Sequence, residues 1–157
     1  MPKITTFLTY DHQAEEAVKL YTSVFPRSRI VQTTRYGDAG PGPKGSVMTI
    51  AFELDGQPFV ALNGGPSFSF SQGISLCVNC ETQAELDRVW DGLCAGGKPI
   101  QCGWLVDRFG VSWQVVPTRM LELMGDPDPA KVRRTVQAML KMVKLDIGAL
   151  QRAHDGA

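Results

Sequence analysis

The order of the predicted elements repeats once along the chain, and this repeat limits the possible fold more than any other feature. Alternating β-branched and aromatic residues predict a strand over residues 4–10, and a helix with an apolar face follows it. The string Gln-Ala-Glu that begins at Gln13 recurs at Gln83, 70 residues later, where a second predicted strand over 74–80 leads into a second helix. Because the identity falls at the same point of the same strand-to-helix unit, the sequence predicts an internal duplication.

The first half continues with three more strands, which are expected at 28–36, 48–54 and 58–62. Asp11 is expected to cap the start of the helix that follows the first strand. Asp55-Gly56 lies between the last two strands, and this pair favours a type I′ hairpin turn because both central residues need positive φ. The first half therefore has the order β-α-β-β-β.

The second half opens in the same way. Thr82 and Glu85 have the spacing of a capping box at the start of its helix. Strands are expected at 99–107 and 111–116, around a turn at 108–110. The helix is expected to bury a stripe of apolar residues: Leu86, Val89, Trp90 and Leu93.

Beyond Pro117 the pattern changes to helices. Asp128-Pro129 predicts a helix start, since the missing N–H of proline costs nothing at the first helical position, and Asp146 is expected to cap a last turn. The sequence thus predicts three parts: 1–66 and 67–118 for the two units, and 119–157 for a C-terminal helical extension. The longer helix of the extension is expected to bury one apolar face, formed by Val132, Val136, Met139, Leu140 and Val143.

The composition argues against two classes of partner. The 157 residues contain 16 basic and 16 acidic side chains, and a net charge of zero argues against general nucleic-acid binding. No run approaches the roughly 18 consecutive apolar residues of a membrane span. The first residues lack the apolar stretch of a signal peptide, so a cytoplasmic protein with reduced cysteines is expected.

The four cysteines are expected to be buried thiols rather than metal ligands. Cys77 and Cys80 form a C-x-x-C pair, but residues three apart on a strand point to opposite faces. Cys102 precedes Gly103 and Trp104, and it is the candidate for a reactive thiol beside a cavity.

Two tandem β-α-β-β-β units resemble the vicinal oxygen chelate superfamily, which includes glyoxalase and the bleomycin-resistance proteins. The resemblance spans residues 3–150 and implies an α+β fold in which each unit curls into a half-barrel, and it also implies a homodimer. Five strings are similar to the PhnB-like branch, often labelled 3-demethylubiquinone-9 3-methyltransferase: Phe52–Gln57, Ala61–Pro66, Ser75–Val78, Cys102–Leu105 and Asp107–Gln114.

Methyl transfer is not expected in spite of that label. The usual S-adenosylmethionine site needs a glycine-rich turn directly after a first parallel strand, so that the backbone can approach the cofactor. Here the first predicted strand leads into Asp11-His12-Gln13 without a glycine.

The resemblance also directs attention to metal ligands. Metal-dependent members of the superfamily bind their cation through His and Glu side chains on inward-facing strand positions. The two histidines, His12 and His154, lie outside the predicted strands, and Gln114 stands where the family motif has its last metal-binding Glu. An uncharged amide is a poor ligand for a divalent ion. The sequence therefore predicts no ancestral metal site and no cofactor.

A curved sheet of this kind leaves a concave face that can hold a small molecule. Gln114 and Asn63 are amides that could orient a ligand there, and Trp104 could supply an apolar wall. Gln114 could instead belong to a structural amide network. Phe68 and Phe70 lie in a serine-rich loop, where they are expected either to form a lid or to plug the mouth of the barrel.

The function expected from these features is small-molecule binding without catalysis, for a ligand that the sequence does not identify. The alternative is a metal-independent enzyme in which Gln114, Asn63 or Cys102 acts on a small dicarbonyl, quinol or thiol. A third possibility is that the C-terminal helices mediate association with a partner.

Overall fold

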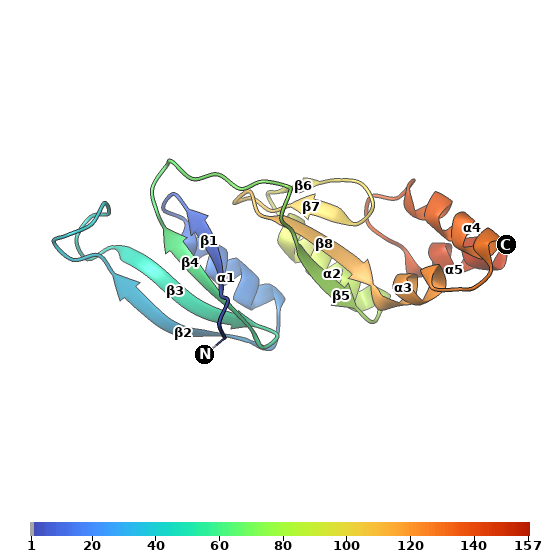
Figure 1. Ribbon diagram of the computed structural model, residues 1–157, viewed down its shortest axis with the longest axis horizontal. Helices are drawn as coiled ribbons and strands as arrows, with labels where there is room; N and C mark the ends of the chain where they lie inside the picture. The colour runs from blue at the N-terminus through green and yellow to red at the C-terminus, as the bar shows by residue number, and fades with distance from the viewer. Residues whose placement is uncertain (1) are drawn as a thin grey trace. The chain divides into compact units, whose positions relative to one another are not determined.

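The computed structural model describes residues 2–157, which divide into two compact units. The first unit ends at Phe70, and the second runs from Ser71 to Ala157 (Figure 1). The α+β class, the tandem β-α-β-β-β units and the C-terminal helices are all confirmed. Every helix within residues 2–157 is too short or too polar to span a bilayer.

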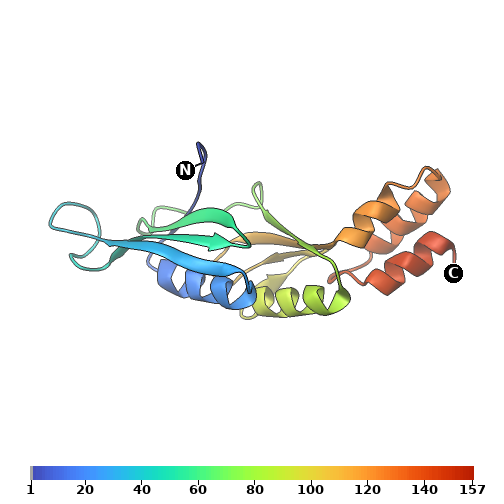
Figure 2. The same cartoon turned by 90° about the horizontal axis from the view of Figure 1, so that it is seen from below.

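The first unit is a four-stranded sheet with one helix on one face (Figure 2). Its strands lie in the order β1-β4-β3-β2, with β1 parallel to β4 and the other pairs antiparallel. Leu8 and Tyr10 alternate with more exposed residues on β1 and are buried, as are Val18 and Tyr21 of α1, and the hydroxyl groups of Tyr10 and Tyr21 lie 3.0 Å apart. The elements are β1 (Thr6–Tyr10), α1 (Ala14–Val24), β2 (Ser28–Arg35), β3 (Val47–Leu54) and β4 (Gln57–Asn63).

Of the two local predictions for this unit, the hairpin turn is confirmed and the helix cap is wrong. Asp55 and Gly56 have φ values of 49° and 81°, which confirms the type I′ turn between β3 and β4. The prediction that Asp11 caps α1 is wrong. The helix begins at Ala14, and the Ala14 N–H donates a hydrogen bond to Oδ1 of Asn63 at 2.9 Å. Parallel pairing places Asn63 beside Tyr10, so the end of β4 lies next to the start of the helix.

The second unit repeats this topology, with strand order β5-β8-β7-β6. Its first strand begins at Leu76 and that of the first unit at Thr6, so the 70-residue offset of the sequence strings also relates the two strands. The shared strand order therefore supports the predicted duplication. The elements are β5 (Leu76–Cys80), α2 (Gln83–Cys94), β6 (Lys98–Pro99), β7 (Trp104–Val106) and β8 (Ser112–Pro117).

The prediction of one strand over 99–107 is wrong. A turn divides this stretch into β6 and β7, which pair with each other. Cys102 and Gly103 have φ values of 60° and 83°, and the Ile100 N–H donates to the Trp104 carbonyl across the turn at 2.8 Å. A left-handed backbone cannot continue a ladder, so the strand reverses and the unit gains its third β-strand after α2.

Helix α2 largely follows its sequence. All four predicted stripe residues are buried. Thr82 Oγ1 accepts the Glu85 N–H at 3.1 Å, whereas the Glu85 carboxylate accepts the N–H of Glu81 rather than that of Thr82. The capping box is therefore confirmed on one side and displaced by one residue on the other.

Three helices follow β8: α3 (Thr118–Met124), α4 (Pro129–Met139) and α5 (Ile147–Asp155). Asp128 and Asp146 cap α4 and α5 as predicted, each accepting a backbone N–H two or three residues on. Helix α3 has no counterpart among the predicted elements. The expected apolar face of α4 is wrong: Thr135 is the buried residue of that helix, and Leu140 and Val143 beyond it are 59% and 41% exposed.

The reason lies in the partner of α4. This helix packs on α5 by a polar contact, in which Arg134 donates to the carbonyl oxygens of Ala153 and His154 at 3.0 and 2.7 Å. Those carbonyls belong to the last turn of α5, where intrahelical partners run out. Val132, Val136 and Met139 of α4 are half-buried, so the guanidinium contact adds to a partly apolar packing.

Candidate functional site

The second sheet has one covered face and one open face. Leu105 and Trp113 are opposite each other on β7 and β8, and they are 0% and 2% exposed beneath α2. Their neighbours Trp104 and Gln114 are also opposite each other, and Gln114 pairs in turn with Cys77 on β5. Because side chains alternate along a strand, these three side chains share the open face.

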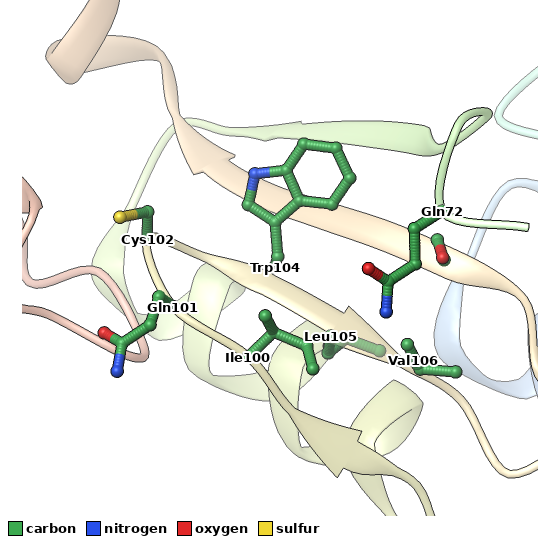
Figure 3. A pocket seen from close by; sticks show the side chains of 8 residues that line it. Gln72, Ile100, Gln101, Cys102, Trp104, Leu105 and Val106 are labelled. Carbon is green, nitrogen blue, oxygen red and sulfur yellow. The ribbon is translucent and has the colours of Figure 1, made fainter.

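A cleft of about 340 Å³ lies at the β7 end of this open face. That volume is at the lower end of the range found for small-molecule sites. In Figure 3 the Trp104 indole stands on β7 between Cys102 and Gln72. None of the residues that line the cleft is charged, and they are Gln72, Ile100, Gln101, Cys102, Trp104, Leu105, Val106 and Ser112.

Ser112 is the polar group that this cleft leaves unsatisfied. The residue is 2% exposed, and its Oγ has no hydrogen-bond partner among the residues that the structure describes. A buried hydroxyl without a partner costs roughly 1–3 kcal/mol. Because the Oγ atom is itself buried, a ligand group in the cleft can bond to it only after a neighbouring side chain moves aside. Ser112 was not among the residues expected at a ligand site, although period-two alternation places it on the same face as Gln114.

Gln114 lies outside the set of cleft residues. It is half-buried, and its Nε2 donates to Ser75 Oγ at 3.0 Å. This contact gives Gln114 a structural partner, which is the alternative that the sequence left open. Its role as a ligand-binding residue stays a prediction.

Asn63, Phe68 and Phe70 belong to the first unit, whereas the cleft is built from the second. Both ends of the Asn63 amide bind backbone, since Oδ1 accepts the Ala14 N–H and Nδ2 donates to the Val47 carbonyl at 3.1 Å. Phe68 is 55% exposed, and the Phe70 ring meets Tyr10 edge-on at 5.1 Å. Their roles at a ligand site stay predictions.

The cysteines differ in environment. Cys80 is fully buried, and this burial, with a smaller effect of Glu85, raises its thiol pKa to about 12. Cys77 is exposed, so the expectation of four buried thiols is wrong there. The opposite orientation of Cys77 and Cys80 is confirmed, and its cause is strand alternation. Cys102 is half-buried in the turn before β7 and lines the cleft.

Within residues 2–157, no group of three or more His, Cys, Asp and Glu side chains is placed to hold a metal ion. Strand register makes Phe7 and Val60 the first unit's equivalents of Cys77 and Gln114. These four positions provide one thiol and neither an imidazole nor a carboxylate.

The two histidines are separate from the cleft lining. His12 is exposed beside Asp11, at 3.4 Å. His154 is buried in the C-terminal helices, where its Nε2 lies 3.0 Å from Asp126 Oδ2.

This chain is similar to known proteins in sequence and in fold. The model of the 3-demethylubiquinone-9 3-methyltransferase family matches residues 2–116. The PhnB protein from Bacillus cereus is 40% identical, with a TM-score of 0.68 over 74% of this chain and 99% of its own. A Pseudomonas aeruginosa protein is 21% identical, with a TM-score of 0.62 over 74% of this chain and 98% of its own, which shows a shared fold.

A more distant similarity involves a glyoxylase/bleomycin resistance protein/dioxygenase domain from Frankia. It is 14% identical, with a TM-score of 0.47 over 74% of this chain and 92% of its own. Among curated proteins, none matches this sequence.

Proposed function

Because this chain belongs to the 3-demethylubiquinone-9 3-methyltransferase family and its second unit contains an uncharged cleft, we propose that it binds a small, uncharged aromatic molecule there. The single observation that carries this proposal is the uncharged lining of the cleft, in which the Trp104 indole offers an aromatic face near the buried Ser112 hydroxyl. A ligand hydroxyl or carbonyl would bond to that hydroxyl, which has no partner among residues 2–157, once a neighbouring side chain moves aside.

The lining of the cleft narrows the chemistry of the ligand. An ionised ligand would lose its hydration without gaining a counter-charge, because no lining side chain carries one. The Trp104 indole offers an aromatic face, and Ile100 and Val106 add aliphatic surface. Gln72 and Gln101 can hydrogen-bond to a neutral polar group at the rim. The best fit is therefore one aromatic ring system with one or two neutral polar groups.

The same lining bears on the alternative of a metal-independent enzyme. General acid–base catalysis needs a titratable group within hydrogen-bond reach of the reacting atom. Among the lining residues, the Cys102 thiol is the one side chain of that kind. Binding is thus the function that this arrangement favours. Methyl transfer is not part of the proposal, because the turn from β1 to α1 is formed by Asp11-His12-Gln13 and lacks the glycines of the usual cofactor site.

The test uses ¹⁵N-labelled full-length protein and a set of neutral aromatic alcohols, ketones and amides, with 2-naphthol as the reference probe. Members of the set are expected to shift the amide signals of Cys102, Trp104 and Ser112. In Ser112→Ala the affinity is expected to fall about tenfold, which corresponds to the loss of one hydrogen bond of about 1.4 kcal/mol.

Thermal unfolding of Ser112→Ala separates binding from structure. The hydroxyl makes no bond within the described chain, so its removal is expected to leave the stability unchanged or higher. The control is Ser46→Ala, which removes an exposed hydroxyl of the first unit that donates to the Pro43 carbonyl, and which should not alter binding. If no compound shifts the cleft signals, or if Ser112→Ala binds as tightly as the wild type, the proposal is wrong.

The homodimer implied by the family resemblance is also a proposal. Light scattering is expected to give a mass twice the 17.2 kDa of the chain. A monomer at micromolar concentration would contradict it.

A further inference from the structure

The C-terminal helices lie beyond the family match. The family model ends at residue 116, and α3 begins at Thr118. The Bacillus relative is matched over 99% of its own length by 74% of this chain. The extension is therefore an addition to the shared architecture, and the chain between α4 and α5 contacts the cleft.

Residues 140–146 join α4 to α5, and we name this segment the strap. Its backbone binds the turn between β6 and β7. The N–H of Cys102 donates to the Met142 carbonyl, and the N–H of Gly103 donates to the Val143 carbonyl, both at 2.8 Å. Leu145 is fully buried, and a Cβ at Gly103 would lie 2.9 Å from its Cδ1 atom. The strap is thus packed tightly on the turn.

Helix α2 holds the other end of the strap. Gln83 is the first residue of α2, and its Nε2 donates to the Leu145 carbonyl at 3.1 Å. Its Oε1 accepts the Ile147 N–H at 2.8 Å. One amide side chain therefore satisfies two backbone groups at the point where the strap enters α5. An exposed ion pair of 3.1 Å between Lys144 and Asp87 adds little to this attachment.

The turn held by the strap has an unfavourable backbone. Cys102 has a φ of 60°, a conformation that costs a residue with a Cβ roughly 1–2 kcal/mol. Such a conformation persists where the surrounding structure fixes it. Two consecutive N–H groups of this turn are bonded to the strap, and the same turn carries Cys102 and leads directly into Trp104. The strap therefore stabilises the backbone from which both cleft side chains project.

We propose that the strap sets the shape of the cleft, and that Gln83 is the positioning residue that keeps the strap in place. Release of the strap frees the Cys102 and Gly103 amides and lets the turn relax, which displaces the wall formed by Cys102 and Trp104. The consequence for ligand affinity rests on the proposed function, whereas the effect on the turn does not. By linkage, a molecule bound in the cleft strengthens the attachment of the strap by the same factor as the strap strengthens binding.

The test variant is Gln83→Met, which keeps the size of the side chain and removes both bonds to the strap, together with the bond that Nε2 donates to Asp87 at 2.9 Å. Amide hydrogen exchange of Cys102 and Gly103 is expected to be at least tenfold faster, and peptide-resolved alkylation of Cys102 by iodoacetamide is expected to be faster as well. The matched control is Gln13→Met, at the equivalent position of the first unit, where the structure shows no bond from the side chain. This control should leave both rates unchanged.

Exchange of Val78, on the central part of β5, distinguishes local release from general unfolding. If Gln83→Met also accelerates Val78, the Gln83→Ala variant, which removes the same bonds to the strap without adding apolar surface, is expected to accelerate the turn alone. Unchanged exchange and alkylation at Cys102 in both variants would overturn the inference. Failure of 2-naphthol and its analogues to slow exchange at Cys102 in the wild type would count against the proposed function while leaving the strap intact.

Discussion

Trp113 and Asp107 are joined by a buried hydrogen bond in which the indole Nε1 donates to Oδ2 at 2.9 Å. The other carboxylate oxygen accepts the backbone N–H groups of Phe109 and Val111 at 2.9 and 3.1 Å. The side chain of Asp107 is 3% exposed, so these donors replace the water that its carboxylate would otherwise bind. One residue thus fixes the turn between β7 and β8 and ties it to the tryptophan beneath α2.

This relationship predicts a large effect of a small substitution. Asp107→Asn has nearly the same shape, but when its oxygen accepts the two turn amides its NH₂ group faces the Trp113 N–H. Two donors then meet in a buried site, and we expect a loss of about 1–3 kcal/mol in the free energy of unfolding. Urea denaturation of the full-length protein measures it. In the Trp113→Phe background, where the opposing donor is absent, the same substitution should cost less, and an equal cost would contradict the pairing.

A pair of glycines separates backbone strain from steric contact. Gly103 and Gly45 have similar positive φ values of 83° and 86°, but a Cβ at Gly103 would lie 2.9 Å from the Val115 carbonyl oxygen, whereas one at Gly45 meets nothing within 4 Å. Gly45→Ala is expected to cost about 1–2 kcal/mol from backbone conformation alone. Gly103→Ala is expected to cost more, because the neighbouring backbone must move. Thermal unfolding of the two variants compares them, and equal losses would show that the turn yields freely.

The C-terminal helices contain carboxylates whose pKa values are lowered by the fold. The Asp128 N–H, followed by the His154 ring and the charge of Lys131, holds the pKa of Asp126 below its ordinary value against a smaller opposing effect of burial. His154, followed by Gln151, lowers the pKa of Asp155 in the same way.

The sign of the pH dependence follows from these shifts. A carboxyl group that is more acidic in the folded state binds fewer protons there than in the unfolded chain, so it stabilises the fold above its unfolded pKa of about 4. That contribution is lost as the pH falls from about 5 through the lowered folded pKa values. We expect urea denaturation to show a smaller loss of stability between pH 5 and pH 3 for Asp126→Asn than for the wild type. Identical pH profiles would exclude a role for Asp126.

The thiols are expected to react in an order set by burial. Cys80 has no exposed surface, and its pKa is raised to about 12 mainly by burial, so almost no thiolate is present at pH 8. Alkylation of the native protein with iodoacetamide, followed by peptide mass spectrometry, is expected to leave Cys80 unmodified while Cys77 reacts. The same reagent in denaturant should modify both. Modification of Cys80 under native conditions would indicate that β5 opens locally.

The elements that depend on neighbouring residues could be predicted from the sequence. Alternation predicted β1, the Asp-Gly pair predicted the hairpin turn at Asp55-Gly56, and helical spacing predicted the buried stripe that includes Leu86 and Leu93. The recurrence of one string at an offset of 70 residues predicted two units of one topology. These features follow from side-chain periodicity and turn chemistry, which act between residues that are close in the chain.

Other features depend on residues far apart in the sequence, and these became visible only in the folded protein. The cap of α1 comes from Asn63 rather than Asp11, because parallel pairing brings the end of β4 to the start of the helix. The turn at Cys102 interrupts an apparently continuous strand, and its amides are bonded to carbonyls about 40 residues later in the chain. No pattern of neighbouring residues predicts that these amides bind carbonyls of a distant segment.

The candidate site could likewise be predicted only in part from the sequence. Trp104 and Cys102 stood out in the sequence as residue types suited to a cavity, and both line the cleft. Ser112 has no such signal, since a serine on a strand is as easily solvated as buried. Its hydroxyl is buried at the cleft without a partner among residues 2–157. Residue types therefore suggested the chemistry of the cleft, whereas the packing of segments distant in the chain determined which polar group is buried there without a hydrogen bond.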